Sequence, residues 1–318
     1  MSRRDCLLAA LVASIWGFNF VVIDWGMGGP DGVAPLLFVA IRFAVVVFPA
    51  VLLVPRPALP WRTVAAIGVF MSMGQFGLLY LAMAAGMPPG IAALVLQAQV
   101  ILTVALAALT LRERPRPLQL AGVLLGCAGL AVVALGRGGD VPLGALLVCL
   151  LAAFSWAIGN VLSRASGAAA DSTRSGAGLS LTVWSATVVP IPLVLLALIV
   201  DGPAGVAHSV GAFGWEAGVS TLYTAGLASL VGYGVFNGLL ARNPSASVVP
   251  WVLLAPVVAM CSAWLLLGDV PTAGEAAGGV VMVSGVLIAM RGAGRRLAPP
   301  LPTPPVLPAA VSVPTAAR

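Results

Sequence analysis

Residues 88–130 read PPGIAALVLQAQVILTVALAALTLRERPRPLQLAGVLLGCAGL, which is two apolar stretches joined by a short charged turn. The pattern returns without a gap 156 positions later in the pairs Pro88 and Pro244, Leu111 and Leu267, Glu113 and Asp269, Pro115 and Pro271, Gly122 and Gly278, and Gly129 and Gly285. The chain therefore reads as a duplicated unit. Its two turns differ in charge, because RERPR (112–116) carries three arginines and GDVPT (268–272) carries none. Cytoplasmic loops collect basic residues, so we expect the two turns on opposite sides of a membrane.

The composition is that of an integral membrane protein. Of 318 residues 60% are apolar and 8% charged, and the mean hydropathy is +1.08, whereas about 25% of a soluble domain is charged. A helix that crosses a bilayer needs about 17 to 25 apolar residues. Ten such stretches can be placed, at about 6–24, 34–54, 63–84, 89–111, 117–136, 142–163, 179–200, 216–241, 245–267 and 272–291.

Ten spans are two sets of five, and a duplicated five-span unit must insert its second copy upside down because five is odd. We therefore predict an all-α integral membrane protein with ten transmembrane helices, arranged as two inverted five-helix repeats around a central cavity. The first repeat is expected over residues 1–136 and the second over 137–291. Residues 292–318 are rich in proline and are expected to form a disordered cytoplasmic tail.

The arginines predict the orientation. All sixteen basic residues are arginines; with the N-terminus inside, Arg42 falls within a span and Arg137 outside, which leaves fourteen on the cytoplasmic side. Acidic residues lean to the opposite side, in or beside the external loops, at Asp31, Asp140, Asp201, Glu216, Asp269 and Glu275. Both termini are therefore predicted to be cytoplasmic. Because the arginines form no patch, a nucleic-acid partner is not expected.

Metal and catalytic chemistry find little support in the sequence. The four cysteines fall inside predicted spans without a metal-binding spacing, and His208 is the single histidine. No aspartate or glutamate is expected to be buried within a span. We predict neither a metal site nor a cofactor, and a polytopic lipid-modifying enzyme would lack its catalytic groups.

Arg42 is the one charged side chain expected at depth. It lies eight residues into the second span, which is about 12 Å from the edge of a hydrocarbon core about 30 Å thick. Arginine at the centre of a span costs at least about 2.5–3.5 kcal/mol, so Arg42 should face the bundle. Two roles stay open for it: a structural tie to neighbouring backbone, or a counter-charge for a substrate carboxylate.

The first span of each repeat carries a matched tryptophan and asparagine. Trp16 and Asn19 share one helical face, as do Trp156 and Asn160. Such pairs would meet near the axis that relates the repeats, where transporters of this kind bind cargo. The alternative is that the asparagines bridge helices and the tryptophans fill space.

Polar stripes mark three further spans. The third span places Ser72 and Gln75 together, and the eighth carries Ser229, Tyr233 and Asn237 in one stripe, which should face inward because lipid cannot satisfy polar groups. In the fourth span Gln97 and Gln99 point about 200° apart on a regular helix, so at most one should line a cavity. We favour one face shared by Gln99 and Thr103, with Gln97 on the other.

Several short strings together resemble one family. WGFNFVVI (16–23), the arginine after AI at Arg42, LRERP (111–115) and FSWAIGN (154–160) resemble the EamA family of the drug/metabolite transporter superfamily. GMPPGIAALVLQAQ (86–99), SLTVWSA (180–186) and VGYGVFNGLL (231–240) are similar to its O-acetylserine/cysteine exporter branch. The second copy departs from the pattern, because it ends in LLLGDVP.

The resemblance implies an inner-membrane secondary transporter that exports small amino-acid-type metabolites by alternating access. A polar, nearly uncharged cavity suits a zwitterionic cargo. Carried over by position, the residues expected to bind substrate are Trp16, Asn19, Arg42, Gln75, Gln99, Trp156, Asn160, Tyr233 and Asn237. Coupling through exchange, facilitated diffusion or the edge residue Asp24 stays open, as does a homodimer built on the small-residue faces.

Two alternative functions stay open. An exporter of other small metabolites or drugs would share the architecture. A membrane scaffold that transports nothing would scatter the polar faces of the first, third, sixth and eighth spans into separate interhelical contacts, whereas a transporter would bring them to one cavity.

Overall fold

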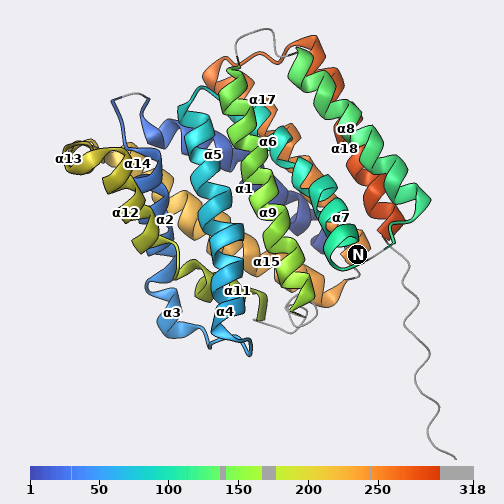
Figure 1. Ribbon diagram of the computed structural model, residues 1–318, viewed down its shortest axis with the longest axis horizontal. Helices are drawn as coiled ribbons and strands as arrows, with labels where there is room; N and C mark the ends of the chain where they lie inside the picture. The colour runs from blue at the N-terminus through green and yellow to red at the C-terminus, as the bar shows by residue number, and fades with distance from the viewer. Residues whose placement is uncertain (30, 113, 137–140, 167–176, 244, 294–318) are drawn as a thin grey trace, which may run out of the picture.

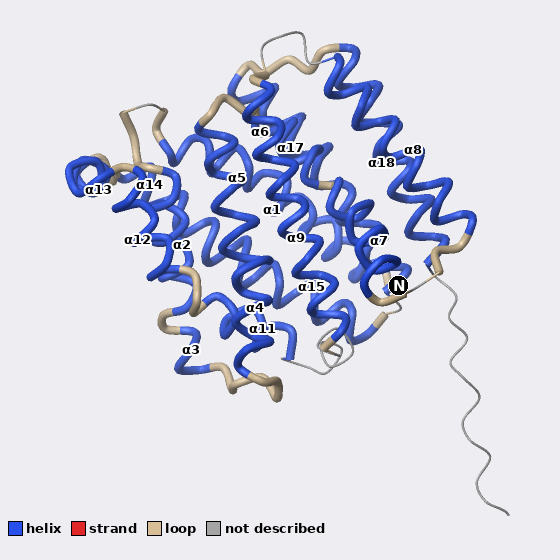
Figure 2. The backbone as a smooth tube through the Cα atoms, in the orientation of Figure 1, coloured by secondary structure: helices blue, strands red, loops and turns tan. Residues whose placement is uncertain are grey.

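The computed structural model describes residues 1–29, 31–112, 114–136, 141–166, 177–243 and 245–293. The proline-rich tail from 294 onward and Arg137 therefore lie outside the described residues. Figure 2 shows helices joined by loops, and no strand, over the described ranges. Within these described ranges ten helices or runs of helices are long and apolar enough to cross a membrane, so the predicted ten-span, all-α fold is confirmed.

The spans follow the chain in order (Figure 1). The first five are α1 (Arg3–Met27), α2 with α3 (Pro35–Val47, Ala50–Leu53), α4 with η1 and α5 (Trp61–Gly68, Val69–Gly74, Gln75–Ala84), α6 with α7 (Pro89–Leu96, Ala98–Thr110), and α8 (Pro117–Gly136). The second five are α9 (Leu143–Ala165), α11 with α12 (Ala177–Ala186, Pro190–Val200), α14 with η2 and α15 (Trp215–Leu222, Tyr223–Val231, Gly232–Arg242), α16 with η3 and α17 (Ser245–Val248, Val249–Leu253, Leu254–Leu267), and α18 (Ala273–Ala293). The short helix α13 (Gly202–Gly211) precedes the eighth span.

Proline and glycine set several helix boundaries. Pro35, Pro89 and Pro190 lie in the first turn of their helices, where a missing backbone N–H costs nothing. α1 and α17 both end at a glycine in the left-handed conformation, Gly28 (φ 73°) and Gly268 (φ 78°). The two glycines thus end α1 and α17 before the polar turn that follows.

The repeat of 156 positions reappears in the backbone. α7 begins at Ala98 and α17 at Leu254, which are 156 positions apart, and both follow a break in their span. The third and eighth spans each contain a π-helical segment, η1 and η2. The start of α8 is capped by Gln119 and that of α18 by Glu275, again 156 positions apart. The duplicated sequence thus folds with duplicated irregularities.

The two fifth spans show the inversion directly. α8 and α18 lie side by side at one edge of the molecule (Figure 1), with Gly122 against Ala289 and Gly136 against Gly274. The pair is therefore antiparallel, although its two helices are equivalent members of the repeat. A Cβ added at Gly136 would lie 2.7 Å from the Cα of Gly274, so only glycine permits this approach. The small-residue faces are used for packing inside the chain.

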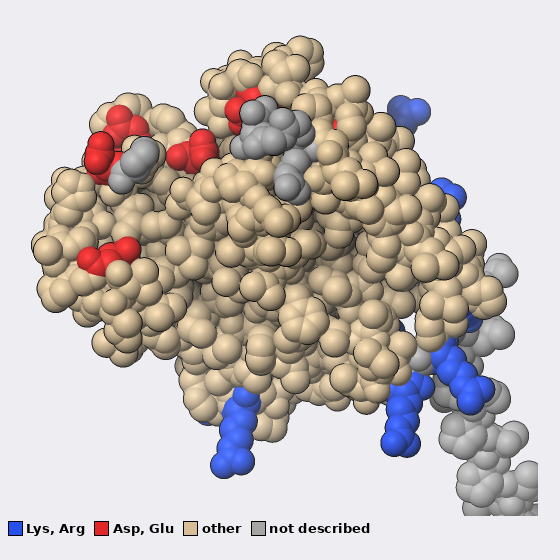
Figure 3. All heavy atoms as spheres, turned by 45° about the horizontal axis from the view of Figure 1, so that its top comes forward, with Lys and Arg blue, Asp and Glu red and all other residues tan. Residues whose placement is uncertain are grey.

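Charge divides the molecule into two ends. The arginine end carries Arg3, Arg62, Arg164, Arg242 and Arg291, and the acidic end carries Asp24, Asp201, Glu216 and Asp269. Figure 3 shows the acidic side chains gathered toward the top of its view and most of the basic ones along the lower and right-hand edges. The turn between α7 and α8 and the turn between α17 and α18 lie at opposite ends, as the inverted repeat requires.

Candidate functional site

A central cavity of about 370 Å³ lies between the two repeats, near the middle of the spans. It is lined by side chains from eight of the ten spans; α8 and the seventh span contribute none of its lining. Eight of the nine residues expected to bind substrate line it, namely Trp16, Asn19, Arg42, Gln75, Gln99, Trp156, Asn160 and Tyr233. The first, third, sixth and eighth spans thus each bring at least one of their predicted polar or aromatic site residues to the same cavity, which is the arrangement expected of a transporter and not of a scaffold.

Arg42 is the charged residue of this cavity. Its side chain is 2% exposed, and it donates two long hydrogen bonds, from Nη1 to Tyr80 Oη (3.3 Å) and from Nη2 to Ser229 Oγ (3.3 Å). The guanidinium also lies 4.2 Å from the ring centroid of Phe76, a cation–π contact. Nε is buried without a partner, and within the described ranges Arg42 makes no ion pair. The cavity therefore holds a positive charge without a counter-ion.

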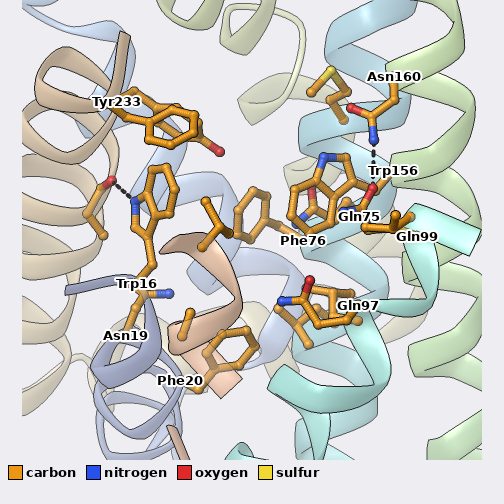
Figure 4. A pocket seen from close by; sticks show the side chains of 18 of the residues that line it. Trp16, Asn19, Phe20, Gln75, Phe76, Gln97, Gln99, Trp156, Asn160 and Tyr233 are labelled. Atoms are coloured by element: carbon orange, nitrogen blue, oxygen red, sulfur yellow. Dashed lines mark hydrogen bonds between the residues drawn. The ribbon is translucent and has the colours of Figure 1, made fainter. Parts of the chain in front are cut away.

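One wall of the cavity is aromatic. The Trp16 ring lies 5.2 Å from that of Tyr233 and 5.1 Å from that of Phe236, between centroids. Its Nε1 donates to the carbonyl of Ala228 (2.8 Å), which belongs to the π-helical segment η2. Figure 4 shows Trp16 and Tyr233 on one side of the cavity.

The facing wall is built of amides. Gln75, Gln97, Gln99 and Asn160 lie together opposite Trp16 in Figure 4. Asn160 Nδ2 donates to Gln99 Oε1 (2.8 Å) and lies 3.3 Å from Thr103 Oγ1, so the predicted shared face of Gln99 and Thr103 is confirmed. These amides present both donors and acceptors to a polar ligand.

The prediction that at most one of Gln97 and Gln99 lines the cavity is wrong. Both do. The span breaks at Gln97, whose N–H bonds to Leu94 O and whose carbonyl accepts from Val100 N–H, both three residues away. This tighter turn brings the two side chains closer in angle than a regular helix would.

Asn237 does not line the central cavity, so the prediction that it does is wrong. Its amide lies against Gly178 on the neighbouring α11, where a Cβ would leave it no room. The missing side chain at Gly178 gives Asn237 space toward α11. Phe236, the preceding residue, faces the cavity instead.

The two π-helical segments are tied to the first span of the opposite repeat. Trp16 in α1 bonds to Ala228 in η2, and Ser155 in α9 donates to the carbonyl of Phe70 in η1 (2.8 Å). A π-helical turn leaves carbonyls without their usual helical partner, and these side chains supply one. The third and eighth spans are thus irregular where they form the cavity.

One acidic side chain is more buried than expected. Glu275 is 5% exposed, which contradicts the expectation that no carboxylate is buried. It lies in the first turn of α18, where Thr272 N–H donates to it (2.8 Å) and Thr272 Oγ1 accepts from Glu275 N–H (3.1 Å). This is a capping box, and the sequence T-x-x-E would have revealed it. Nearby Asp269 lies outside the spans, and burial raises the pKa of its carboxyl.

The lining is more apolar than the sequence suggested. Aromatic and aliphatic side chains cover most of it, including residues that the sequence analysis did not select: Phe20, Met71, Phe76, Leu79, Leu96, Val100, Phe236, Val252 and Met290. No aspartate or glutamate among the described residues lines the cavity. The described part of the chain also contains no cluster of three His, Cys, Asp or Glu side chains that could bind a metal ion.

Comparison with known proteins agrees with the motifs. A family model described as the EamA-like transporter family matches residues 4–135 and 143–291. A Salmonella typhimurium protein named "Probable amino-acid metabolite efflux pump" is 39% identical over 290 residues, which cover 91% of this chain and 95% of that protein. An Escherichia coli protein of the same name is 40% identical with the same coverage.

A solved crystal structure supports the fold. It is 22% identical, superposes with a TM-score of 0.58, and covers 93% of this chain and 99% of the solved chain. The predicted resemblance is confirmed, so this multi-pass membrane protein is a transporter of the two-repeat drug/metabolite fold and not an enzyme. The chain belongs to the EamA-like transporter family.

Proposed function

We propose that the protein exports small zwitterionic amino-acid metabolites, of the O-acetylserine and cysteine kind, across the cell's inner membrane. Cargo would enter the central cavity from the arginine end and leave at the acidic end by alternating access between the repeats. Both termini would then be cytoplasmic, because arginines mark the cytoplasmic side. The names of the relatives from Salmonella typhimurium and Escherichia coli point the same way.

The unpaired charge of Arg42 is the observation that carries this proposal. A buried cation without a counter-ion is costly unless something anionic pairs with it. A carboxylate is the anion that a zwitterionic metabolite would bring, and arginine binds carboxylates through two parallel hydrogen bonds. The amides of Gln99 and Asn160 can meet the cargo's ammonium and other polar groups.

A second cargo class fits the aromatic lining. Trp16 and Phe236 opposite the amides, together with Phe76 beside Gln75, give the cavity a large aromatic surface, which would favour a metabolite or drug with an apolar part. The two classes differ in what they need from Arg42, because a neutral apolar cargo has no carboxylate for it to bind.

Metabolite release from overproducing cells tests the proposal. Cells that express the wild-type protein should release more cysteine and O-acetylserine than cells with an empty vector. Arg42→Ala and Asn160→Ala should reduce release toward the empty-vector level, whereas Arg62→Ala, an exposed arginine far from the cavity, should leave it unchanged. Equal release from all strains would remove the assignment, and loss of release with Arg62→Ala alone would remove the role of the cavity.

A further inference from the structure

A second, outer cavity of about 530 Å³ lies on the acidic side of the central one and is lined in part by the same helices, α1, α2 and α5. On α1 the central cavity ends at Phe20 and the outer one begins at Asp24; on α5 the change falls between Leu79 and Met83. Four residues are about one helical turn, or about 5–6 Å. On α2 the change falls between Arg42 and Pro35, which is about two turns. One to two turns of packed side chains therefore separate the two cavities.

Ile23, Phe38 and Tyr80 lie between the two cavities on α1, α2 and α5 and belong to one buried cluster, and we call these three residues the outer seal. Their side chains are 0%, 1% and 1% exposed. The rings of Phe38 and Tyr80 meet edge to face, with centroids 5.7 Å apart, and Phe213 packs against the other side of Phe38 at 6.2 Å. Ile23 belongs to α1, Phe38 to α2 and Tyr80 to α5. Relative movement of these three helices would therefore open the seal.

Arg42 connects the seal to the central cavity. It lines the cavity, and its Nη1 donates to the hydroxyl of Tyr80 in the seal at 3.3 Å. A carboxylate is a much stronger acceptor for a guanidinium than a phenol hydroxyl is. A carboxylate that enters the cavity would therefore compete with Tyr80 for the same donor.

We propose that the Arg42–Tyr80 hydrogen bond holds the outer seal closed in the empty protein, and that a cargo carboxylate releases the seal by taking Arg42 from Tyr80. This rests on the proposed function, because it gives cargo binding the task of opening the exit. It makes Tyr80 a positioning residue that touches no cargo. Occupancy of the central cavity by a carboxylate then favours the state that is open to the acidic end.

The chain offers a matched control for Tyr80→Phe. The partly buried hydroxyl of Tyr223 donates to the carbonyl of Ile15 (3.0 Å). Tyr223 lines neither the central nor the outer cavity. Tyr223→Phe removes the same atom and one hydrogen bond without touching the seal. A difference between the two variants therefore reports on the position of the hydroxyl.

Cysteine labelling measures the seal without reference to the identity of the cargo. The four native cysteines are first replaced, and Val100→Cys in the central cavity then serves as the reporter. Intact cells are treated with a membrane-impermeant, negatively charged methanethiosulfonate. Ala34→Cys in the outer cavity shows that the acidic end faces the reagent and gives the rate for an open site. Gel filtration of each purified variant establishes that it is folded.

In the wild-type background Val100→Cys should react much more slowly than Ala34→Cys. Tyr80→Phe should raise its rate about tenfold, as expected when a hydrogen bond to a charged group is lost from the closed state alone, and Tyr223→Phe should not. O-acetyl-L-serine should raise the wild-type rate and add little to that of Tyr80→Phe. If Tyr80→Phe does not give folded protein, Phe38→Leu takes its place as the test variant. It removes part of the seal beside Tyr80 and is expected to raise the labelling rate of Val100→Cys.

The outcomes separate the role of the Arg42–Tyr80 hydrogen bond, which we call the latch, from the identity of the cargo. If Val100→Cys is labelled no faster in the Tyr80→Phe background than in the Tyr223→Phe background, the latch is refuted. If Val100→Cys already reacts as fast as Ala34→Cys in the wild type, the seal is refuted. If Tyr80→Phe speeds labelling but O-acetyl-L-serine has no effect on the wild type, the latch is supported and the proposed cargo is what fails.

Discussion

Replacing Arg42 with methionine separates a structural role from a cargo-binding one. Methionine keeps much of the length of the side chain and removes the charge. A structural tie predicts that stability falls, whereas a cargo site predicts that stability holds and transport falls. The contacts of Arg42 allow both effects to be estimated.

The stability terms nearly cancel. The variant loses two hydrogen bonds, each 3.3 Å long, together worth about 3 kcal/mol at the lower end for a charged donor, and a cation–π contact worth about 1 kcal/mol. It regains about 2.5–3.5 kcal/mol, because no charge has to be inserted at depth. The net loss of stability should be about 0.5–1.5 kcal/mol, which moves the thermal midpoint by less than about 5 °C for a chain of this size.

Transport should respond far more strongly. Removing one partner of a buried charge pair costs about 2–5 kcal/mol, which corresponds to a loss of about 30-fold to about 4,000-fold in apparent affinity. Efflux of O-acetyl-L-serine from loaded proteoliposomes gives the affinity, and tryptophan fluorescence in detergent gives the thermal midpoint. Arg62→Met, at the exposed arginine end, is the control. A midpoint that falls by more than about 15 °C while the remaining protein transports with unchanged KM would show that Arg42 is a structural tie and refute the reasoning.

Three further predictions follow from the packing. Asn237→Ala should leave metabolite release within about twofold of wild type, because the side chain faces α11 and not the cavity. Gly129→Ala should destabilise the α8–α18 pair by about 1–3 kcal/mol in thermal unfolding, because its Cβ would meet the backbone of α18, whereas Gly144→Ala, which has open space around it, should be neutral or stabilising. Trp16→Phe should cost about 1–3 kcal/mol of stability, because it leaves a carbonyl of η2 without its donor; an unchanged thermal midpoint would contradict this.

The ten spans and their inversion could be predicted because they depend on properties that single residues carry. Apolar length sets each span, and the pairing of Pro88 with Pro244 and Gly122 with Gly278 reveals the duplication. The antiparallel contact of α8 with α18 then follows from the odd number of spans. None of these predictions depends on knowledge of the contacts between particular side chains.

The finer geometry of the cavity depends on contacts between distant segments, and so the sequence could not supply it. The break at Gln97 brings both glutamines to the cavity, although a regular helix would separate them. Asn237 follows Tyr233 by one helical turn, yet the space beside Gly178 decides where it points. Tyr80 is the partner of Arg42 through packing alone, and no motif marks it.

A structure with O-acetyl-L-serine bound tests the central claim most directly. The account predicts cargo density inside the central cavity, with the carboxylate within about 3 Å of the Arg42 guanidinium and the Tyr80 hydroxyl no longer bonded to it. Cargo bound elsewhere, or bound in the cavity with its carboxylate turned away from Arg42, would contradict the account.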